Sequence, residues 1–393
     1  MKQIPMLDLK REYEYMKTDI DSAIKKCLDE QKWILGPEVK ELEDKIAEYI
    51  GVKHCIGVSS GTEALVLALR AIAIQLKGEE YFSRDDEIIT TPFTFTATGD
   101  AILRSGATPV FVDIDPATYN IDSNKIREYL TQNSTNVVGM IPVHLYGQAC
   151  NMDEITDIAQ KHELFVVEDV AQAFGGAWRG KKLGSTGTAG TFSFFPSKNL
   201  GGFGDGGMIS TNDEQISELI RMLLKHGGKD KYNVDHIGYN ARLDTLQAAI
   251  LLAKLKFIDD FNARRKKIAS IYHQELSSVK GITLPTSQIS GTTRSSISHS
   301  TDDCVYHQYT MRIHNNKRND FQEFLKEEGI STMVYYPVPL HKMKVFAGKM
   351  KVLDSLNNSI QATQEVCSLP IEPLQESEDT SYIIAIIKQF FKT

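Results

Sequence analysis

The sequence predicts an α/β protein in which helices cover a mainly parallel β-sheet. Short apolar runs bounded by turn residues predict buried strands, and stretches of helical pattern such as 123–130 alternate with them. That alternation is typical of a parallel sheet with helices on its faces. The expected strands cover residues 55–58, 87–91, 109–114, 137–143, 164–167, 191–195 and 208–211.

The chain of 393 residues is too long for one small core, which predicts two domains. We expect a large domain over 1–255, which includes an N-terminal arm, and a small C-terminal α+β domain over 256–393. A helical pattern from 246 to 276 predicts one long helix that links the domains. The Ser- and Thr-rich residues 286–303 predict a flexible loop within the second domain.

Composition narrows the classes of protein. With 41% hydrophobic and 24% charged residues the chain is expected to be globular, and its net charge of −7 disfavours nucleic acid and acidic membranes as general partners. Five cysteines, without a Cys-x-x-Cys pair, indicate a reduced compartment and give no sign of a metal site. The first ten residues contain no long apolar segment, and no window approaches the apolar length of a membrane span. We therefore expect a cytoplasmic protein.

The stretch 163–207 holds the candidate chemistry. Asp169 follows an apolar run that predicts a strand, and Lys198 lies on the turn after the next predicted strand. In an open α/β sheet ligands bind beyond the carboxyl ends of the strands, so we expect both side chains in one crevice. A lysine amine can condense with the aldehyde of pyridoxal 5′-phosphate, and a carboxylate can keep its pyridine nitrogen protonated. The pair therefore predicts a pyridoxal phosphate site.

A glycine turn predicts where the cofactor phosphate binds. The turn Ser59-Ser60-Gly61-Thr62 joins the predicted strand 55–58 to an Ala- and Leu-rich helix. Free backbone amides and the helix dipole make such a helix N-terminus an anion site. We expect Gly61 and Thr62 to hold the phosphate through their amides and the Thr62 hydroxyl. The alternative is that Ser59 or Ser60 only caps the helix.

Two longer motifs carry a family resemblance. Residues 194–201 read Phe-Phe-Pro-Ser-Lys-Asn-Leu-Gly, and residues 168–175 read Glu-Asp-Val-Ala-Gln-Ala-Phe-Gly. Together they resemble the DegT/DnrJ/EryC1/StrS family of sugar-nucleotide aminotransferases, and the likeness extends from 34–38 to 368–370. The resemblance implies a pyridoxal phosphate-dependent transferase of fold type I, the aspartate aminotransferase-like fold. It also implies a homodimer with its sites at the subunit interface.

Further cofactor contacts follow from this resemblance. It places Phe95 on the pyridine ring, although packing in the core is the alternative for this side chain. Gln172 is expected to face the ring oxygen or the substrate, and Ser193 the cofactor phosphate. Asn240 belongs to a loop that, in the family, reaches into the neighbouring subunit's site, and it is expected to contact the phosphate there.

Three residues are candidates for binding the substrate. Arg242 follows Asn240 closely and could contact an anion, with an ordinary salt bridge within the subunit as the alternative. The segment 333–341 resembles the part of the family that borders the substrate, which makes Tyr336 and His341 candidates for sugar or diphosphate contacts. A surface position without a role is the alternative for His341.

In the implied reaction Lys198 forms the resting Schiff base, and glutamate is the amino donor. The freed lysine moves a proton from the donor to the cofactor, and a keto-sugar nucleotide then receives the amine. A lysine that acts as a base must be neutral, so the site must lower a pKa that is about 10.4 in free lysine. Asp169 must stay ionised beside the pyridinium.

The resemblance also points to a substrate. The motifs at 34–38, 143–148 and 193–198 look most like those of enzymes that act on a UDP-linked 3-keto N-acetylglucuronic acid, in the biosynthesis of surface polysaccharides such as O-antigen. The alternatives are a 4-keto-6-deoxy sugar nucleotide and a dTDP-linked 3-keto-6-deoxy hexose. A noncatalytic, pyridoxal phosphate-binding regulator is the competing class of protein.

Overall fold

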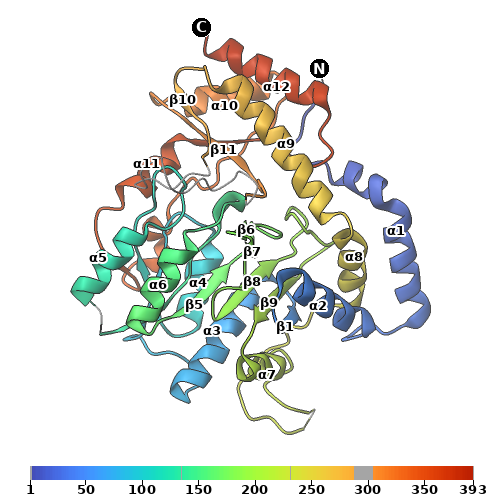
Figure 1. Ribbon diagram of the computed structural model, residues 1–393, viewed down its shortest axis with the longest axis vertical. Coiled ribbons are helices and arrows are strands. Elements are labelled where there is room, and N and C mark those ends of the chain that lie inside the picture. Colours follow the sequence, from blue (N-terminus) through green and yellow to red (C-terminus); the bar gives the residue numbers. More distant parts are fainter. Residues whose placement is uncertain (1, 134, 231, 287–303, 393) are drawn as a thin grey trace.

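A computed structural model describes residues 2–133, 135–230, 232–286 and 304–392. Its main feature is an eight-stranded sheet with the strand order β1-β9-β8-β5-β4-β2-β3-β12 (Figure 1). The strands are β1 (His54–Val58), β9 (Gly207–Thr211), β8 (Ala189–Ser193), β5 (Phe165–Asp169), β4 (Val137–Met140), β2 (Glu87–Thr90), β3 (Thr108–Phe111) and β12 (Lys351–Val352).

The sheet is parallel except at one edge. All neighbours from β8 through β5, β4, β2 and β3 to β12 run parallel, whereas β9 pairs antiparallel with both β8 and β1. Strands β2, β3, β5 and β9 are buried along their whole length, as expected of a sheet that is covered on both faces. The predicted α/β class is therefore confirmed.

Two hydrophobic cores lie on opposite faces of this sheet. One core joins it to α2 (Pro37–Ile50), α5 (Ser123–Asn133), α6 (Met152–His162) and α8 (Thr245–Leu255). The other joins it to α3 (Gly61–Lys77), α4 (Thr96–Arg104) and α7 (Glu214–Leu223). Helix α3 is buried from Ala64 to Ala73, which makes it the central helix of its face.

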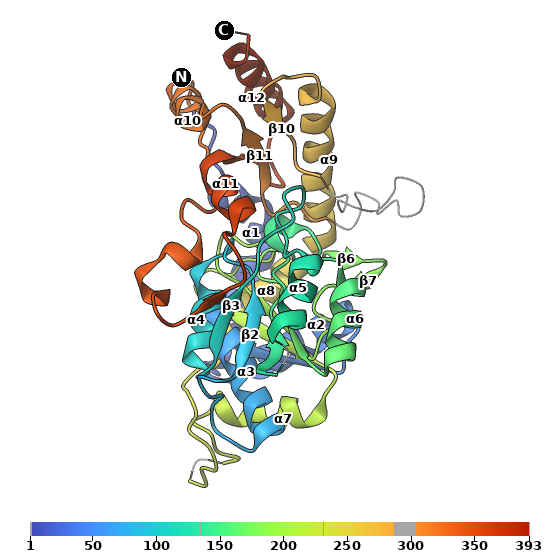
Figure 2. The ribbon, with the colours of Figure 1, turned by 90° about the vertical axis from the view of Figure 1, so that its left-hand side faces the viewer.

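A smaller unit lies above the sheet in the views of Figures 1 and 2. It contains the antiparallel sheet β10-β11-β13 and a core shared by α9, α10 and α12. Its elements are β10 (Ile282–Thr283), β11 (Tyr309–Ile313), β13 (Val366–Leu369), α9 (Ile258–Leu276), α10 (Arg318–Glu327) and α12 (Ser377–Phe390). The proposed boundary at residue 255 falls between α8 and α9.

Segments from both ends of the chain join the two units. Ile4 in the N-terminal arm pairs with Ile330 of the smaller unit, and α1 (Leu9–Glu30) then runs along α8. In return, β12 adds to the edge of the large sheet, and α11 (Asn357–Glu365) follows it. The remaining elements are the hairpin β6 (Ala177–Trp178) and β7 (Lys181–Lys182), and the 3-10 turns η1 (Leu145–Gly147), η3 (Leu340–Lys342) and η4 (Lys344–Phe346).

The prediction of one long helix over 246–276 is wrong. The chain forms α8 and α9, which are separated at Lys256 and Phe257. The two helices bury their apolar residues in different cores: Leu251 of α8 packs in the large unit, and Tyr272 of α9 packs in the small one. The break lets each helix turn its apolar side toward its own core. One straight helix with this pattern could not face both cores. The predicted loop over 286–303 lies, from residue 287 on, outside the described residues.

Within the described ranges no helix combines the length and apolarity needed to cross a bilayer. The same residues hold no cluster of His, Cys, Asp and Glu that could bind a metal ion. All five cysteines are buried, and none of them forms a disulfide in the described part of the chain.

Candidate active site

Three strands end at the same edge of the large sheet and carry the candidate residues. Gly207 of β9 pairs with Val58 on one side and with Ser193 on the other, so the carboxyl ends of β1 and β8 lie one strand apart. Asp169 ends β5 and pairs with Thr191 of β8. The register thus brings the turn after β1, the end of β8 and the end of β5 together, as expected for a site of this fold class.

Lys198 lies on a tight turn directly after β8, over residues 195–201. The backbone N–H of Lys198 donates to the carbonyl of Phe195 at 2.8 Å, and that of Gly202 donates to Phe194 at 2.7 Å. Burial lowers the pKa of Lys198 to about 8, although the charge of Asp169 opposes the shift. The amine is therefore partly neutral near pH 8, which is the direction that a role as base requires.

Asp169 is a buried acid with neutral hydrogen-bond partners. Its Oδ2 accepts from the Thr98 hydroxyl at 2.9 Å and its Oδ1 from the Ala171 amide at 3.1 Å. Burial raises the pKa of Asp169, while these two hydrogen bonds and the charge of Lys198 oppose the rise. A cation next to this carboxylate would stabilise its ionised form.

The N-terminus of α3 lies against the end of β8. The Ser60 hydroxyl caps the helix by accepting from the Glu63 amide at 3.1 Å, as in the capping alternative. The first-turn amides of Gly61 and Thr62 have no helical carbonyl four residues before them, so the cap leaves them available to an anion. A side chain at Gly61 would place its Cβ 2.7 Å from the Cβ of Ser193. Only glycine allows this approach, and it brings the helix N-terminus next to the Ser193 hydroxyl.

Phe95, Tyr336 and Gln172 form a connected group beside Asp169. The side chain of Phe95 is 56% exposed, in contrast to Phe93, which is fully buried. Packing in the core is therefore the environment of Phe93 and not of Phe95. The rings of Phe95 and Tyr336 lie 6.2 Å apart, and the Gln172 amide donates to the Tyr336 hydroxyl at 2.8 Å. The Gln172 oxygen accepts from the amide of Tyr146 at 2.9 Å.

Asn240 and Arg242 run past the end of β1. Arg242 pairs with Val58 in an isolated bridge, and the Ser59 amide donates to the carbonyl of Ala241 at 3.0 Å. Asn240 is exposed and pairs with Lys225, and the Arg242 side chain is partly exposed. Among the described residues Arg242 has no ion pair, so the salt bridge considered for it is not formed there.

His341 lies in η3, whose Leu340 packs in one core with Phe111 of β3. Both of its ring nitrogens are buried without a hydrogen-bond partner among the described residues. Burial lowers the pKa of His341; Lys342 adds to the shift and Asp113 opposes it. No contact found in the described part of the chain joins His341 or Asn240 to Lys198 or Asp169.

Sequence reasoning missed two buried polar groups at this edge. His144 Nε2 lies 3.1 Å from Glu168 Oε2, and the His144 amide donates to the carbonyl of Asp169 at 3.0 Å. Although burial opposes it, the hydrogen bond from His144 holds the pKa of Glu168 below its usual range. The second group joins Asn199, directly after the lysine, to His307 at 3.0 Å. Glu168 and Asn199 are direct neighbours of the predicted pair, and that adjacency was the available signal.

The residues at this edge fit pyridoxal 5′-phosphate. Asp169 is a buried acid that a protonated ring nitrogen would stabilise, and Lys198 is an amine of lowered pKa for the aldehyde. The first turn of α3 and Ser193 offer donors for a phosphate, and Phe95 offers an exposed ring face.

Comparison with known proteins agrees with this arrangement. Residues 14–388 match the family model described as the DegT/DnrJ/EryC1/StrS aminotransferase family. The chain is 42% identical over 390 residues to the "pleiotropic regulatory protein" of Geobacillus stearothermophilus, with 99% of each chain covered. It is 39% identical over 387 residues to the UDP-2-acetamido-2-deoxy-3-oxo-D-glucuronate aminotransferase of Pseudomonas aeruginosa, covering 98% of this chain and 99% of that one.

A solved structure shows the same fold. DesV of S. venezuelae, crystallised in complex with a ketimine intermediate, superposes with a TM-score of 0.91 at 35% identity and 100% coverage of both chains. A full-length family match, a full-length structural match and a site that fits the cofactor lead to one conclusion. The chain belongs to the DegT/DnrJ/EryC1/StrS aminotransferase family and is a pyridoxal phosphate-dependent sugar-nucleotide aminotransferase.

Proposed function

We propose that the protein transfers the amino group of glutamate to a UDP-linked 3-keto N-acetylglucuronic acid, in the cytoplasm and for a surface polysaccharide such as O-antigen. The observation that carries the reaction type is the pair of Lys198 and Asp169 at the carboxyl edge of the sheet, where each affects the pKa of the other. The P. aeruginosa relative, whose name states this acceptor, supports the choice of substrate.

Some residues of the site bind the cofactor, and Lys198 transfers protons. Bound pyridoxal phosphate would supply an aldehyde for the amino group and a ring that withdraws electrons. Lys198 takes up and returns the proton of the reacting carbon, because its lowered pKa leaves a neutral fraction near pH 8. Asp169, held by Thr98, would stabilise positive charge on the ring nitrogen of the bound cofactor. Gly61, Thr62 and Ser193 would hold its phosphate.

The acceptor is anionic at its diphosphate and at its uronate. Arg242 is the proposed contact for one of these groups, since its guanidinium is partly exposed beside the end of β1 and has no described ion-pair partner. Tyr336 and His341 are the proposed contacts for the sugar. Tyr336 is fixed by Gln172, and His341 has two ring nitrogens that a sugar hydroxyl or a water could satisfy.

A visible spectrum of the purified protein tests both halves of the reaction. We expect L-glutamate to remove the visible absorbance of the lysine-bound cofactor, and a UDP-linked 3-keto N-acetylglucuronic acid to restore it. Restoration only by a 4-keto-6-deoxy sugar nucleotide, or only by a dTDP-linked 3-keto-6-deoxy hexose, would replace the proposed substrate with that alternative. If glutamate has no effect on a protein that holds the cofactor, the proposed amino donor is wrong.

A regulatory role is the second candidate, because the relative from G. stearothermophilus is named a pleiotropic regulatory protein. A regulator that only binds the cofactor needs neither an amine of lowered pKa nor a buried acid that stabilises charge on the ring, yet the chain has both. Turnover of glutamate and a keto-sugar nucleotide by the wild-type protein, lost in Lys198→Ala, would decide for the enzyme.

We also propose that the protein is a homodimer with shared sites. Asn240 is exposed near the end of β1, where a second copy could receive it. Sedimentation of the purified protein tests the oligomeric state, and a monomer at working concentration would contradict this part of the proposal.

A further inference from the structure

The turn that carries Lys198 is tied to the smaller unit through its neighbour, Asn199. The Asn199 Nδ2 group donates to Asn262 Oδ1 of α9 at 2.8 Å and to the carbonyl of Val305 at 3.2 Å. Its Oδ1 lies 3.0 Å from Nδ1 of His307. All three contacts are buried, so the amide of Asn199 uses both its donors and its acceptor inside the protein.

These contacts determine which nitrogen of His307 carries the proton. A flipped Asn199 amide would place its oxygen against the Val305 carbonyl, where neither atom could donate. The oxygen of Asn199 must therefore face His307, and His307 Nδ1 must be the donor in that hydrogen bond. Burial, together with the charges of Lys198 and Arg265, lowers the pKa of His307 well below its usual value. His307 is thus a neutral imidazole with its proton on Nδ1.

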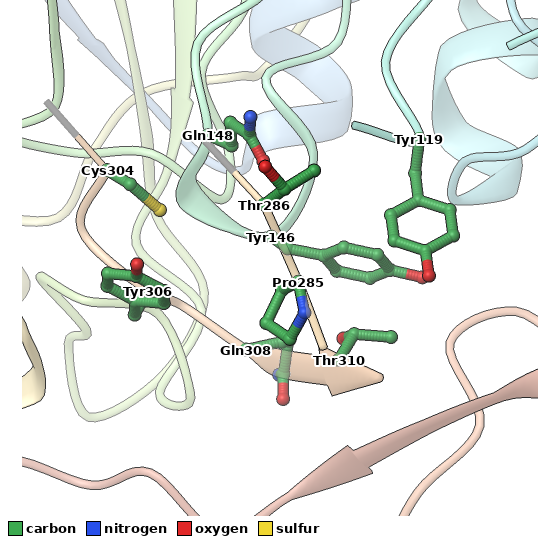
Figure 3. A pocket seen from close by; sticks show the side chains of 9 residues that line it. All are labelled: Tyr119, Tyr146, Gln148, Pro285, Thr286, Cys304, Tyr306, Gln308 and Thr310. Atoms are coloured by element: carbon green, nitrogen blue, oxygen red, sulfur yellow. The ribbon is translucent and has the colours of Figure 1, made fainter. Parts of the chain in front are cut away.

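The segment around His307 is also anchored to η1, the turn whose Tyr146 amide contacts Gln172. The Val305 amide donates to the carbonyl of Gly147 at 3.0 Å, and the Gln308 amide donates to that of Tyr146 at 3.3 Å. Figure 3 shows Tyr306 and Gln308 of this segment near Tyr146 around a small cavity of about 10 Å³, room for about one water molecule. The segment therefore touches both the lysine turn and the turn that holds Gln172.

We propose that His307 is a positioning residue for Lys198: its Nδ1–H group fixes Asn199, and Asn199 fixes the lysine turn against α9 and the segment 305–308. The smaller unit thereby takes part in holding the reactive amine. Without the imidazole, the Asn199 oxygen is left buried without a donor, the turn loosens, and water reaches Lys198. The consequence for catalysis rests on the proposed function, but the positioning itself does not.

Competitive labelling of the cofactor-free protein tests this directly. Trace acetic anhydride at a series of pH values, followed by mass spectrometry of the peptides, gives the titration midpoint of Lys198. The groups that face Lys198 are Asp169 and His307, and those that face His307 are Lys198 and Arg265. Exposed Lys181 on the same chain serves as the internal reference for an ordinary amine.

Three variants of His307 separate positioning from packing. His307→Leu keeps the volume but removes the donor, and we expect the Lys198 midpoint to rise by about one pH unit as water enters. His307→Asn keeps a donor at the place of Nδ1, so we expect the wild-type midpoint. His307→Gln moves the amide toward the place of Nε2 and should behave like His307→Leu. His273→Leu is the matched control, because His273 contacts Ala269 and Pro285 in the smaller unit.

An unchanged midpoint in a folded His307→Leu protein would overturn the proposal, and so would a raised midpoint that His307→Asn does not restore. If His307→Leu does not fold, the comparison of His307→Asn with His307→Gln decides, and equal midpoints would overturn it. The labelling needs neither cofactor nor substrate. A wrong substrate would therefore show in the visible spectrum and leave these midpoints as they are.

Discussion

The hydroxyl of Thr98 donates to Oδ2 of Asp169 at 2.9 Å, and both side chains are buried. This contact links α4, which begins directly after Phe95, to Asp169 at the end of β5. A hydrogen bond to the ionised carboxylate favours its charge, in opposition to burial. Thr98 is thus the residue through which α4 affects the charge of Asp169.

Thr98→Val should weaken cofactor binding. The substitution keeps the shape of the side chain but removes the donor, so the pKa of Asp169 rises further and its attraction for a protonated ring nitrogen falls. Loss of one such hydrogen bond costs about 1–2 kcal/mol, which corresponds to a roughly five- to thirtyfold weaker affinity. Titration of the cofactor-free protein with pyridoxal phosphate measures this affinity.

The matched control for this variant is Thr90→Val. Thr90 is also buried, and its hydroxyl donates to the carbonyl of Ile141 at 2.9 Å, away from Asp169. Thr90→Val should lose about as much stability as Thr98→Val, but it should keep the wild-type affinity for pyridoxal phosphate. Equal affinities for the two variants would show that Thr98 does not act through Asp169.

Lys198→Ala should abolish turnover. The variant lacks the group that moves the proton, and the loss of such a group lowers the rate by about 10²–10⁴-fold or more. The remaining contacts at Gly61, Ser193 and Asp169 should still bind the cofactor without a covalent bond. Turnover and reduction with borohydride measure the two effects. Lys181→Ala, at an exposed position, should match the wild type; normal activity in Lys198→Ala would contradict the mechanism.

The rate at which the cofactor-free protein binds pyridoxal phosphate covalently should depend on pH, with a midpoint of about 8. Only the neutral amine attacks the aldehyde, so the rate rises with pH below the midpoint and levels above it. In Asp169→Asn the carboxylate that opposes the lowered pKa of Lys198 is gone, so the midpoint should move further down. Stopped-flow absorbance gives both profiles. A wild-type midpoint near 10 would mean that burial does not lower this pKa.

The local sequence predicted the sheet and the placement of Lys198 and Asp169 at one edge of it. Asp169 and Lys198 each follow an apolar run, and strands that end at one edge bring such residues together whatever the details of packing. The local sequence could not show which of Phe93 and Phe95 is buried and which is exposed. The two rings lie two residues apart, and only the start of α4 after Phe95 turns one into the core and leaves the other exposed.

Contacts between distant segments could not be predicted from one sequence. Asn199 and His307 lie 108 positions apart, and nothing in the pattern around either residue specifies the other. The break between α8 and α9 has the same origin, because both helices have a continuous helical pattern and only the presence of two separate cores divides them. Tertiary packing determined these features, and local propensity did not.

Arg242 provides the test of whether sites are shared between subunits. Arg242→Ala should raise the Michaelis constant for the sugar nucleotide about 10- to 100-fold, the cost of one lost hydrogen-bonded charge contact. Arg127→Ala is the control, since Arg127 pairs with Glu154 between α5 and α6. An unchanged Michaelis constant would remove Arg242 from the substrate site.

Mixing the two variant chains, and assaying them at a sugar-nucleotide concentration below the wild-type Michaelis constant, then shows which subunit uses Arg242. If Arg242 completes the partner's site, a dimer of one Lys198→Ala chain and one Arg242→Ala chain contains one intact site. Equal amounts of the two variants, dissociated and reassociated, should then regain roughly a quarter of the wild-type activity, because half of the randomly formed dimers are mixed. If Arg242 acts in the site of its own chain, beside Val58 and the first turn of α3, no mixed dimer is complete and the activity stays at the level of the separate variants.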